Sequence, residues 1–368
     1  MVGHVSTAVD TPLPNVRPLV DELATALRAL PEVSVLAIED TASLPNPDPK
    51  ADASLMLEVL GRPARLLIEA STYGYPRDLR DAASRLRYLA NLAGDPPLTP
   101  LIVADALSPG GKEMLRDRGI GYWDRGGSLY LKLPWALFYV DRPQPRSSSR
   151  KLRSLYRGSA AQVVHALLVE PSRLWHVNEL AERAEVSVSR VHEVLSELEQ
   201  HLWVEKRGRG PTAVRALVDP GALLDSWAEA HSLKEYVLRL YHGWSQSPTS
   251  LRSSVIAALG LRQIPYALTL TSGAEHIAPF VIGNERLTLL AQDHPALSQA
   301  TDWAGLSPVD EGENVVLLVT HQRAPLLFRQ SVGSLQVAST VQLYLDLWVS
   351  PRRGKEQARH LRAERLPY

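Results

Sequence analysis

The segment between Ala160 and Asp219 constrains the fold more than any other part of this 368-residue chain. Apolar residues recur every three or four positions in three consecutive stretches, which predicts three short helices. The first covers residues 162–170, the second begins at Val177, and the third follows a tight turn over residues 184–186 with Ser187 as its N-cap. The expected inner face of the third helix consists of Val188, Val191, Val194, Leu195 and Leu198.

A short hairpin is predicted directly after the third helix. Residues 202–204 and 213–218 alternate like two strands, and the turn between them holds basic residues among glycines. Three helices followed by such a hairpin constitute the winged helix-turn-helix pattern. The segment resembles the winged domains of MarR-like and related bacterial regulators over about 60 residues.

This resemblance implies double-stranded DNA as a partner and a homodimer as the binding form. The third helix would enter the major groove, and the hairpin would contact phosphates or the minor groove. The DNA-contacting residues expected on this basis are Ser187, Ser189, Arg190 and His192 on the helix and Lys206, Arg207 and Arg209 on the hairpin.

The distribution of charge supports DNA as the partner. The whole chain has 40 basic and 40 acidic residues, whereas the stretch from Arg142 to Arg215 has 13 Lys or Arg and 8 Asp or Glu. A local basic excess in a neutral chain is typical of a DNA-contacting surface. The alternative is a protein-interaction module, which Glu193 and Glu197 on the outer side of the third helix favour.

Composition restricts the remaining possibilities. The chain is 45% apolar and 22% charged, as expected of two or three globular domains. It has no cysteine, which excludes disulfides, thiolate catalysis and cysteine-ligated zinc. No apolar run approaches 18 residues and no signal-peptide pattern is present, so we expect a cytoplasmic protein with no membrane partner.

Residues 1–145 are predicted to form a mixed α/β domain with the order helix, three strands, helix, strand and further strands. This order resembles the core of the PD-(D/E)XK, or restriction-endonuclease-like, superfamily. The matching residues are Asp52 before one strand and Glu69 at the end of the next, and the resemblance implies that they hold Mg²⁺ for catalysis. Ser71 occupies the position of the lysine that such nucleases use.

Three interpretations of this domain remain open. It is an intact Mg²⁺-dependent nuclease in which Lys50, Arg77 or Arg80 replaces the lysine, a degenerate nuclease-like domain used for binding, or an unrelated α/β domain. The resemblance also implies that Asp124 and Arg125, in a glycine-rich turn, face the cleft.

Residues 221–368 are predicted to form a third, α/β domain that opens with a helix over residues 221–241. Near its end, a helix carrying Gln342, Tyr344 and Asp346 precedes a basic break and a second short helix. This segment resembles the closing part of AbiEi-like antitoxins, the transcriptional regulators of type IV toxin–antitoxin systems. The resemblance implies regulation and a toxin partner.

The sequence therefore predicts an α/β multidomain protein. It comprises a restriction-endonuclease-like domain over residues 1–145, a basic linker and winged helix-turn-helix over 146–220, and an AbiEi-like domain over 221–368. The favoured function is an antitoxin-like, DNA-binding transcriptional repressor that needs no cofactor. The alternatives are a Mg²⁺-dependent DNA nuclease and a non-enzymatic antitoxin that binds its toxin.

Overall fold

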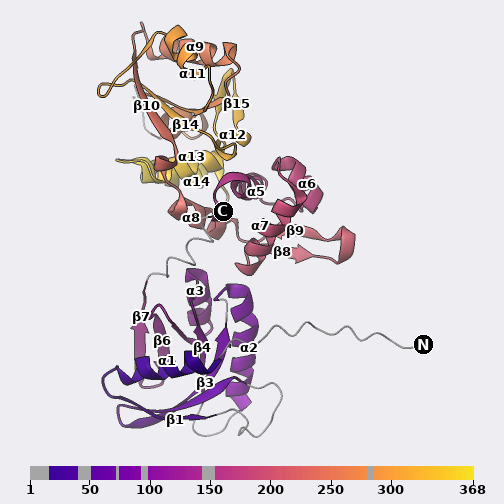
Figure 1. The fold of residues 1–368 in the computed structure, drawn as a ribbon, viewed down its shortest axis with the longest axis vertical. Helices are drawn as coiled ribbons and strands as arrows, with labels where there is room; N and C mark the ends of the chain where they lie inside the picture. The colour runs from indigo at the N-terminus through magenta and orange to yellow at the C-terminus, as the bar shows by residue number, and fades with distance from the viewer. Residues whose placement is uncertain (1–15, 40–50, 72–73, 93–97, 143–153, 281–285) are drawn as a thin grey trace, which may run out of the picture. The chain divides into compact units, whose positions relative to one another are not determined.

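The chain folds as a mixed α/β protein with two compact units, residues 1–150 and 151–368 (Figure 1). A computed structural model describes residues 16–39, 51–71, 74–92, 98–142, 154–280 and 286–368. Each unit is built on its own seven-stranded sheet. None of the helices in these ranges combines the length and apolar character needed to cross a bilayer.

The first unit is a sheet whose strands lie side by side in chain order. Strands β3, β4 and β5 run parallel, and the other neighbours are antiparallel. Its elements are α1 (Val16–Arg28), β1 (Val33–Glu39), β2 (Ala53–Val59), β3 (Arg62–Ser71), α2 (Pro76–Leu92), β4 (Leu98–Ala104), α3 (Pro109–Asp117), β5 (Gly121–Asp124), β6 (Leu129–Leu133) and β7 (Ala136–Val140). This agrees with the element order that the sequence predicts.

Alternation along the strands divides the core of this unit into two layers. On β3, Leu66 and Ile68 pack in the layer that includes α1, whereas Leu67 packs in the layer that includes α2. Leu60 and Gly61 both have positive φ, 54° and 72°, which is the geometry of a tight two-residue hairpin turn. The turn fixes the register of β2 against β3, which places Ala53 opposite Ile68 at the far end of the pair.

The second unit begins with three helices and a two-stranded hairpin. These are α5 (Gly158–Val169), α6 (Val177–Arg183), α7 (Val188–Gln200), β8 (Val204–Arg207), the 3₁₀ turn η2 (Gly210–Thr212) and β9 (Val214–Leu217). All three predicted helices are present. Leu202 does not join the hairpin: it has a φ of 60° and lies in the turn after α7.

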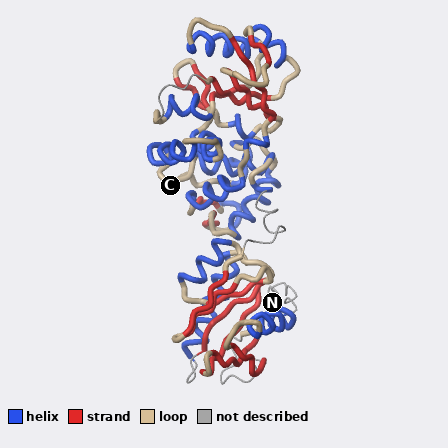
Figure 2. Tube along the Cα trace, turned by 90° about the vertical axis from the view of Figure 1, so that its left-hand side faces the viewer, coloured by secondary structure: helices blue, strands red, loops and turns tan. Residues whose placement is uncertain are grey.

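The rest of the second unit contains a seven-stranded sheet with helices around it, drawn red and blue in Figure 2. The strands lie in the order β13-β10-β14-β12-β11-β16-β15. Helices α9 and α11 lie on one side of this sheet, and α13 and α14 lie on the other (Figure 1). The elements are α8 (Pro220–Ala230), η3 (Leu233–Glu235), β10 (Val237–Gly243), α9 (Pro248–Leu261), β11 (Tyr266–Leu268), α10 (Leu270–Ile277), β12 (Leu287–Gln292), α11 (Leu297–Trp303), β13 (Leu306–Pro308), β14 (Val315–Thr320), α12 (Ala324–Leu327), β15 (Gln330–Val332), β16 (Leu335–Val337), α13 (Thr340–Trp348) and α14 (Gly354–Arg365).

The predicted long helix over residues 221–241 is wrong in its second half. Helix α8 ends at Ala230, and Val237–Gly243 forms the strand β10 between β13 and β14. The apolar residues of this stretch fit either period when read alone. Pairing with the fully buried strand β14 decides in favour of the strand.

Helix α5 packs both against α6 and α7 and against α12 and α13, which belong to the domain with the sheet. Nine consecutive residues, Ala160–Leu168, are buried, so the helix is covered on every side. The fully buried His165 bonds Ala324 O at 3.0 Å and Ser339 Oγ at 2.6 Å, on α12 and at the start of α13. One hydrophobic cluster accordingly runs from Leu155 to Leu366.

The residues that carry the antitoxin resemblance lie inside this core. Gln342, Tyr344 and Asp346 are on α13 as predicted, and each is at most 2% exposed. The Asp346 carboxylate accepts from Thr269 Oγ1 at 2.6 Å, Gln342 Nε2 at 2.8 Å and Tyr236 OH at 3.2 Å, and His231 Nε2 lies 2.9 Å away. The residues that form this pattern therefore stabilise the core of the domain and are not part of an exposed surface.

Candidate nucleic-acid interface

Helix α7 is positioned by its cap and by four buried residues. Ser187 precedes the helix in an extended conformation, and its hydroxyl accepts from the N–H of Arg190 at 3.3 Å. The predicted N-cap is thus confirmed. Val191, Val194, Leu195 and Leu198 are each at most 2% exposed and pack against the helices before them.

The opposite face of α7 is exposed at the N-terminal end of the helix. Ser187, Ser189, Arg190 and His192 are all exposed there, so the structure places the four predicted helix residues together. Arg190 Nη1 lies 2.7 Å from Glu193 Oε2 one turn along the helix. A solvent-exposed pair of this kind is worth well under about 1 kcal/mol, and a phosphate can replace the carboxylate.

Val188 differs from the sequence prediction. It was expected on the inner face, but it is 43% exposed. Val188 is the first residue of α7, whereas the buried residues of this helix begin at Val191, one turn later. An exposed apolar side chain beside Ser189 and Arg190 suits contact with a thymine methyl group in the major groove.

The hairpin after α7 carries the remaining predicted residues. Lys206, Arg207 and Arg209 are exposed, and the register places Lys206 opposite Arg215 and Arg207 opposite Val214. Gly208 and Gly210 on either side of Arg209 have φ values of 84° and 64°, a backbone conformation that glycine adopts without strain.

A third segment pairs with this hairpin, which the sequence did not indicate. Trp175 N donates to Arg215 O at 2.9 Å, and Arg215 N donates to Trp175 O at 2.8 Å. The fully buried Trp175 ring is covered by the guanidinium of Arg173 at 3.9 Å. The base of the hairpin is therefore attached to the chain that leads into α6.

Internal ion pairs offset much of the basic excess of this segment, including at the hairpin, where Arg207 lies 3.2 Å from Glu205. Arg215 is buried and lies 2.5 Å from Glu199, and Arg173 and Arg183 both pair with Glu170, at 2.9 and 2.6 Å. Within the ranges that the structure describes, no ion pair involves Lys206 or Arg209. The linker residues Arg146, Arg150, Lys151 and Arg153 lie outside the described residues.

The two predicted catalytic carboxylates of the first unit lie at the adjacent ends of β2 and β3. Asp52 precedes β2: its N–H donates to Ile68 O at 3.0 Å and its Oδ2 accepts from the N–H of Ala70 at 2.8 Å, so it bonds the residues on either side of Glu69. Burial raises the pKa of the Asp52 carboxyl, against the opposing effects of the Ala70 N–H and Arg85.

Arg85 on α2 is the residue at this site that sequence reasoning missed. Its guanidinium pairs with Glu69 Oε1, and Glu69 is 7% exposed. Among the described residues no group of three His, Asp or Glu is placed to hold a metal ion, and Lys50 is not described. Because a guanidinium already binds Glu69 and Ser71 replaces the expected lysine, these donors fit an ion pair better than Mg²⁺.

The glycine-rich turn of the first unit is also internally paired. Asp124 is 2% exposed and accepts from Ser128 N at 3.1 Å, with Lys112 Nζ at 3.7 Å. Arg125 bonds Glu22 at 2.8 and 2.9 Å and Asp105 at 2.6 Å. The two side chains therefore have separate structural partners, and the buried Asp124 is directed into the unit.

The strongest candidate site is thus the surface formed by the N-terminal end of α7 and the hairpin tip. The helix end carries exposed polar, apolar and basic side chains, and the hairpin carries exposed basic ones. Comparison with known proteins adds nothing to this geometry: no family model, no curated protein and no solved structure matches the chain.

Proposed function

We propose that residues 154–219 form a winged helix-turn-helix that binds double-stranded DNA, and that the protein is a transcriptional regulator acting as a homodimer. The observation that carries the proposal is the pairing pattern of the arginines. Arg215 is buried and paired with Glu199, and the exposed Arg173 and Arg183 both pair with Glu170, whereas Lys206 and Arg209 on the hairpin have no acidic partner in the described chain. Arg190 and Arg207 have only exposed partners close in sequence, Glu193 and Glu205. Cations left without local partners are suited to phosphates.

The two elements have different tasks in this proposal. Helix α7 reads base edges through Ser189, Arg190 and His192, with Val188 beside them. The hairpin holds the backbone through Lys206, Arg207 and Arg209 and contributes affinity without sequence preference. Each half of a two-fold operator would take one copy of the chain.

A salt titration tests the hairpin. The double variant Arg207→Ala/Arg209→Ala should lower the slope of log K against log salt by about 2, because each lost phosphate contact removes about 0.9. Fluorescence anisotropy with a labelled duplex measures this slope. Arg262→Ala is the matched control, since Arg262 is exposed at the end of α9, at the other end of the same unit from the hairpin (Figure 1). An unchanged slope in the double variant would exclude the hairpin as a DNA contact.

Selection from random duplexes tests α7. Arg190→Ala should change the selected sequence, whereas the hairpin double variant should select the same sequence with weaker binding. If Arg190→Ala selects the wild-type sequence, α7 does not read bases.

A metal-dependent nuclease is the second candidate, and one observation favours it. Glu69 Oε2 is buried and has no hydrogen-bond partner among the described residues, a state that a cation would relieve. Under our proposal the purified protein does not cleave plasmid DNA with Mg²⁺ or Mn²⁺. Cleavage that Glu69→Gln abolishes would instead establish the nuclease.

A further inference from the structure

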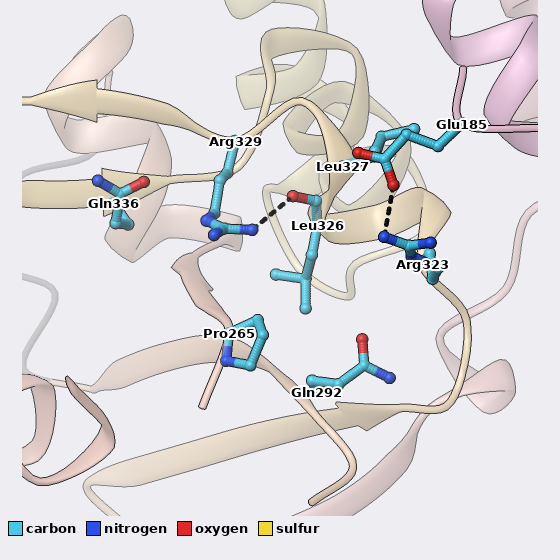
Figure 3. A pocket seen from close by; sticks show the side chains of 8 residues that line it. All are labelled: Glu185, Pro265, Gln292, Arg323, Leu326, Leu327, Arg329 and Gln336. Carbon is cyan, nitrogen blue, oxygen red and sulfur yellow. Dashed lines mark hydrogen bonds and ion pairs between the residues drawn. The ribbon is translucent and has the colours of Figure 1, made fainter. Parts of the chain in front are cut away.

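A pocket of about 500 Å³ lies beside the turn between α6 and α7. Glu185, from that turn, forms one side, and the other walls come from the C-terminal sheet and α12 (Figure 3). Its polar lining consists of Arg323, Arg329, Gln292 and Gln336, and Leu326 and Leu327 supply apolar surface. This volume is in the range of small-molecule sites.

The two arginines give the pocket an affinity for anions. Arg323 is paired with Glu185, and Arg329 Nη1 donates to Leu326 O at 3.1 Å. A guanidinium has five N–H donors, so a single bond to a carbonyl leaves most of the Arg329 donors for a ligand. With Glu185 counted, these three side chains carry a net charge of +1, and a bidentate anion such as a phosphate matches the guanidinium geometry.

The two glutamines indicate what else the ligand carries. Gln292 Nε2 donates to Thr320 O at 3.0 Å, and Gln336 Nε2 donates to Ser331 Oγ at 2.9 Å. With the amide nitrogens engaged, the carbonyl oxygens remain as acceptors, and in Figure 3 both point toward the middle of the pocket. The matching ligand offers hydroxyl or amino donors in addition to its negative charge.

We propose that this pocket binds a phosphorylated metabolite of nucleotide size, with the phosphate on Arg323 and Arg329 and donor groups on Gln292 and Gln336. Bound phosphate replaces Glu185 as the partner of Arg323. Glu185 has a φ of 54° in the turn that ends three residues before α7, so the ligand alters the contact that braces this turn. The freed carboxylate lies next to the proposed DNA surface and disfavours phosphate there, so the ligand lowers DNA affinity. This regulatory part rests on the proposed function.

Calorimetry on the full chain tests the pocket without DNA. The probe is AMP, compared with ribose 5-phosphate, inorganic phosphate and adenosine. We expect AMP to bind, adenosine not to bind, and Arg329→Ala to weaken AMP at least about tenfold while Arg262→Ala has no effect. Binding of none of the three phosphates, equal binding of AMP to Arg329→Ala, or binding of inorganic phosphate as tight as that of AMP would overturn the assignment.

DNA titrations with and without AMP test the coupling. AMP should lower the DNA affinity of the wild type by about tenfold, within the usual range of allosteric coupling. Glu185→Gln should still bind AMP, but its DNA affinity should no longer respond. If AMP binds through Arg329 and no duplex binds under any salt condition, the ligand assignment of the pocket is supported and the proposed DNA-binding function is wrong. If DNA binds and AMP leaves its affinity unchanged, the coupling through Glu185 is wrong.

Discussion

Single buried polar residues determine how the second unit responds to pH. Burial lowers the pKa of His165 from 6.5 to about 4, and Ala324 O, which can only accept, fixes the proton of the neutral ring on Nδ1. Nε2 then accepts from the Ser339 hydroxyl. The bond at Nε2 requires the neutral imidazole, whereas the bond to Ala324 O is kept in either form, and burial of the ring is the larger effect that disfavours the charged form.

The sign of the resulting pH dependence follows from the direction of this shift. Between pH 6.5 and about 4 the unfolded chain binds a proton that the folded chain excludes, so stability is full above pH 6.5 and falls as the pH decreases. The loss reaches about 3 kcal/mol, at about 1.4 kcal/mol per pH unit. Urea unfolding near pH 7 and near pH 5 should show this slope in the wild type. In His165→Gln the slope should be smaller while stability is lower at both pH values; an identical slope would contradict the assignment.

Asp346 provides a second prediction at this scale. Its neighbours Thr269, Gln342 and Tyr236 all direct donors at a carboxylate that is fully buried. In Asp346→Asn, an amide N–H₂ would face donors, and the unfolding free energy should fall by about 3 kcal/mol or more. Asp225→Asn is a suitable control, since Asp225 is exposed and its partner Arg362 also bonds Tyr368 O. Equal stability of the two variants would show that the donors around Asp346 rearrange at little cost.

At the scale of elements, the N-cap of α7 is separable from the exposed side chains that we propose to contact DNA. Ser187→Ala removes the hydroxyl that accepts from Arg190 N and should destabilise the second unit by about 1 kcal/mol. Ser189→Ala changes an exposed residue of the same type two positions later and should leave stability unchanged. Urea titration compares the two, and Ser187→Asp should restore the cap. If Ser189→Ala lowers the free energy of unfolding as much as Ser187→Ala does, the effect of Ser187→Ala does not come from loss of the N-cap.

The elements that were predictable from sequence are those held by local periodicity. The helices α5, α6 and α7 follow from apolar spacing, and the β2–β3 hairpin follows from the strands around Gly61. Short strands such as β13, β15 and β16 have three residues each, too few to show a period, and only their neighbours in the sheet define them.

The candidate sites likewise divide into features set by neighbouring residues and features set by contacts between residues distant in the sequence. The exposed end of α7 was predictable because its cap and inner face are local. The pairing of Arg85 with Glu69 was not, because it joins a helix to a strand across 16 positions and leaves no repeating signal in the sequence. Glu185 and Arg323 are 138 positions apart, so the pocket emerges only when the second unit folds.

At the scale of the whole molecule, the two units have separate hydrophobic cores. We therefore expect two unfolding transitions rather than one. Leu23→Ala, on the buried face of α1, should lower only the first unit's transition, and Leu345→Ala on α13 should lower only the second, each by about 2–5 kcal/mol. Calorimetry with both variants assigns the transitions. A single transition that both variants shift equally would mean that the units unfold together.

The burial of residues 160–168 of α5 has a consequence for the exchange of winged-helix-like segments between proteins. In many multidomain proteins a linker allows such a segment to be recombined with new partners. In this protein the first helix of the segment, α5, is also part of the hydrophobic core of the following domain, through His165 and the residues packed around it. A transplanted segment would bring an uncovered apolar helix into its new host, and the abandoned domain would lose part of its core. If the proposed DNA binding holds, its specificity should therefore diversify by substitutions on the outer face of α7, with α5 inherited together with the domain that it supports.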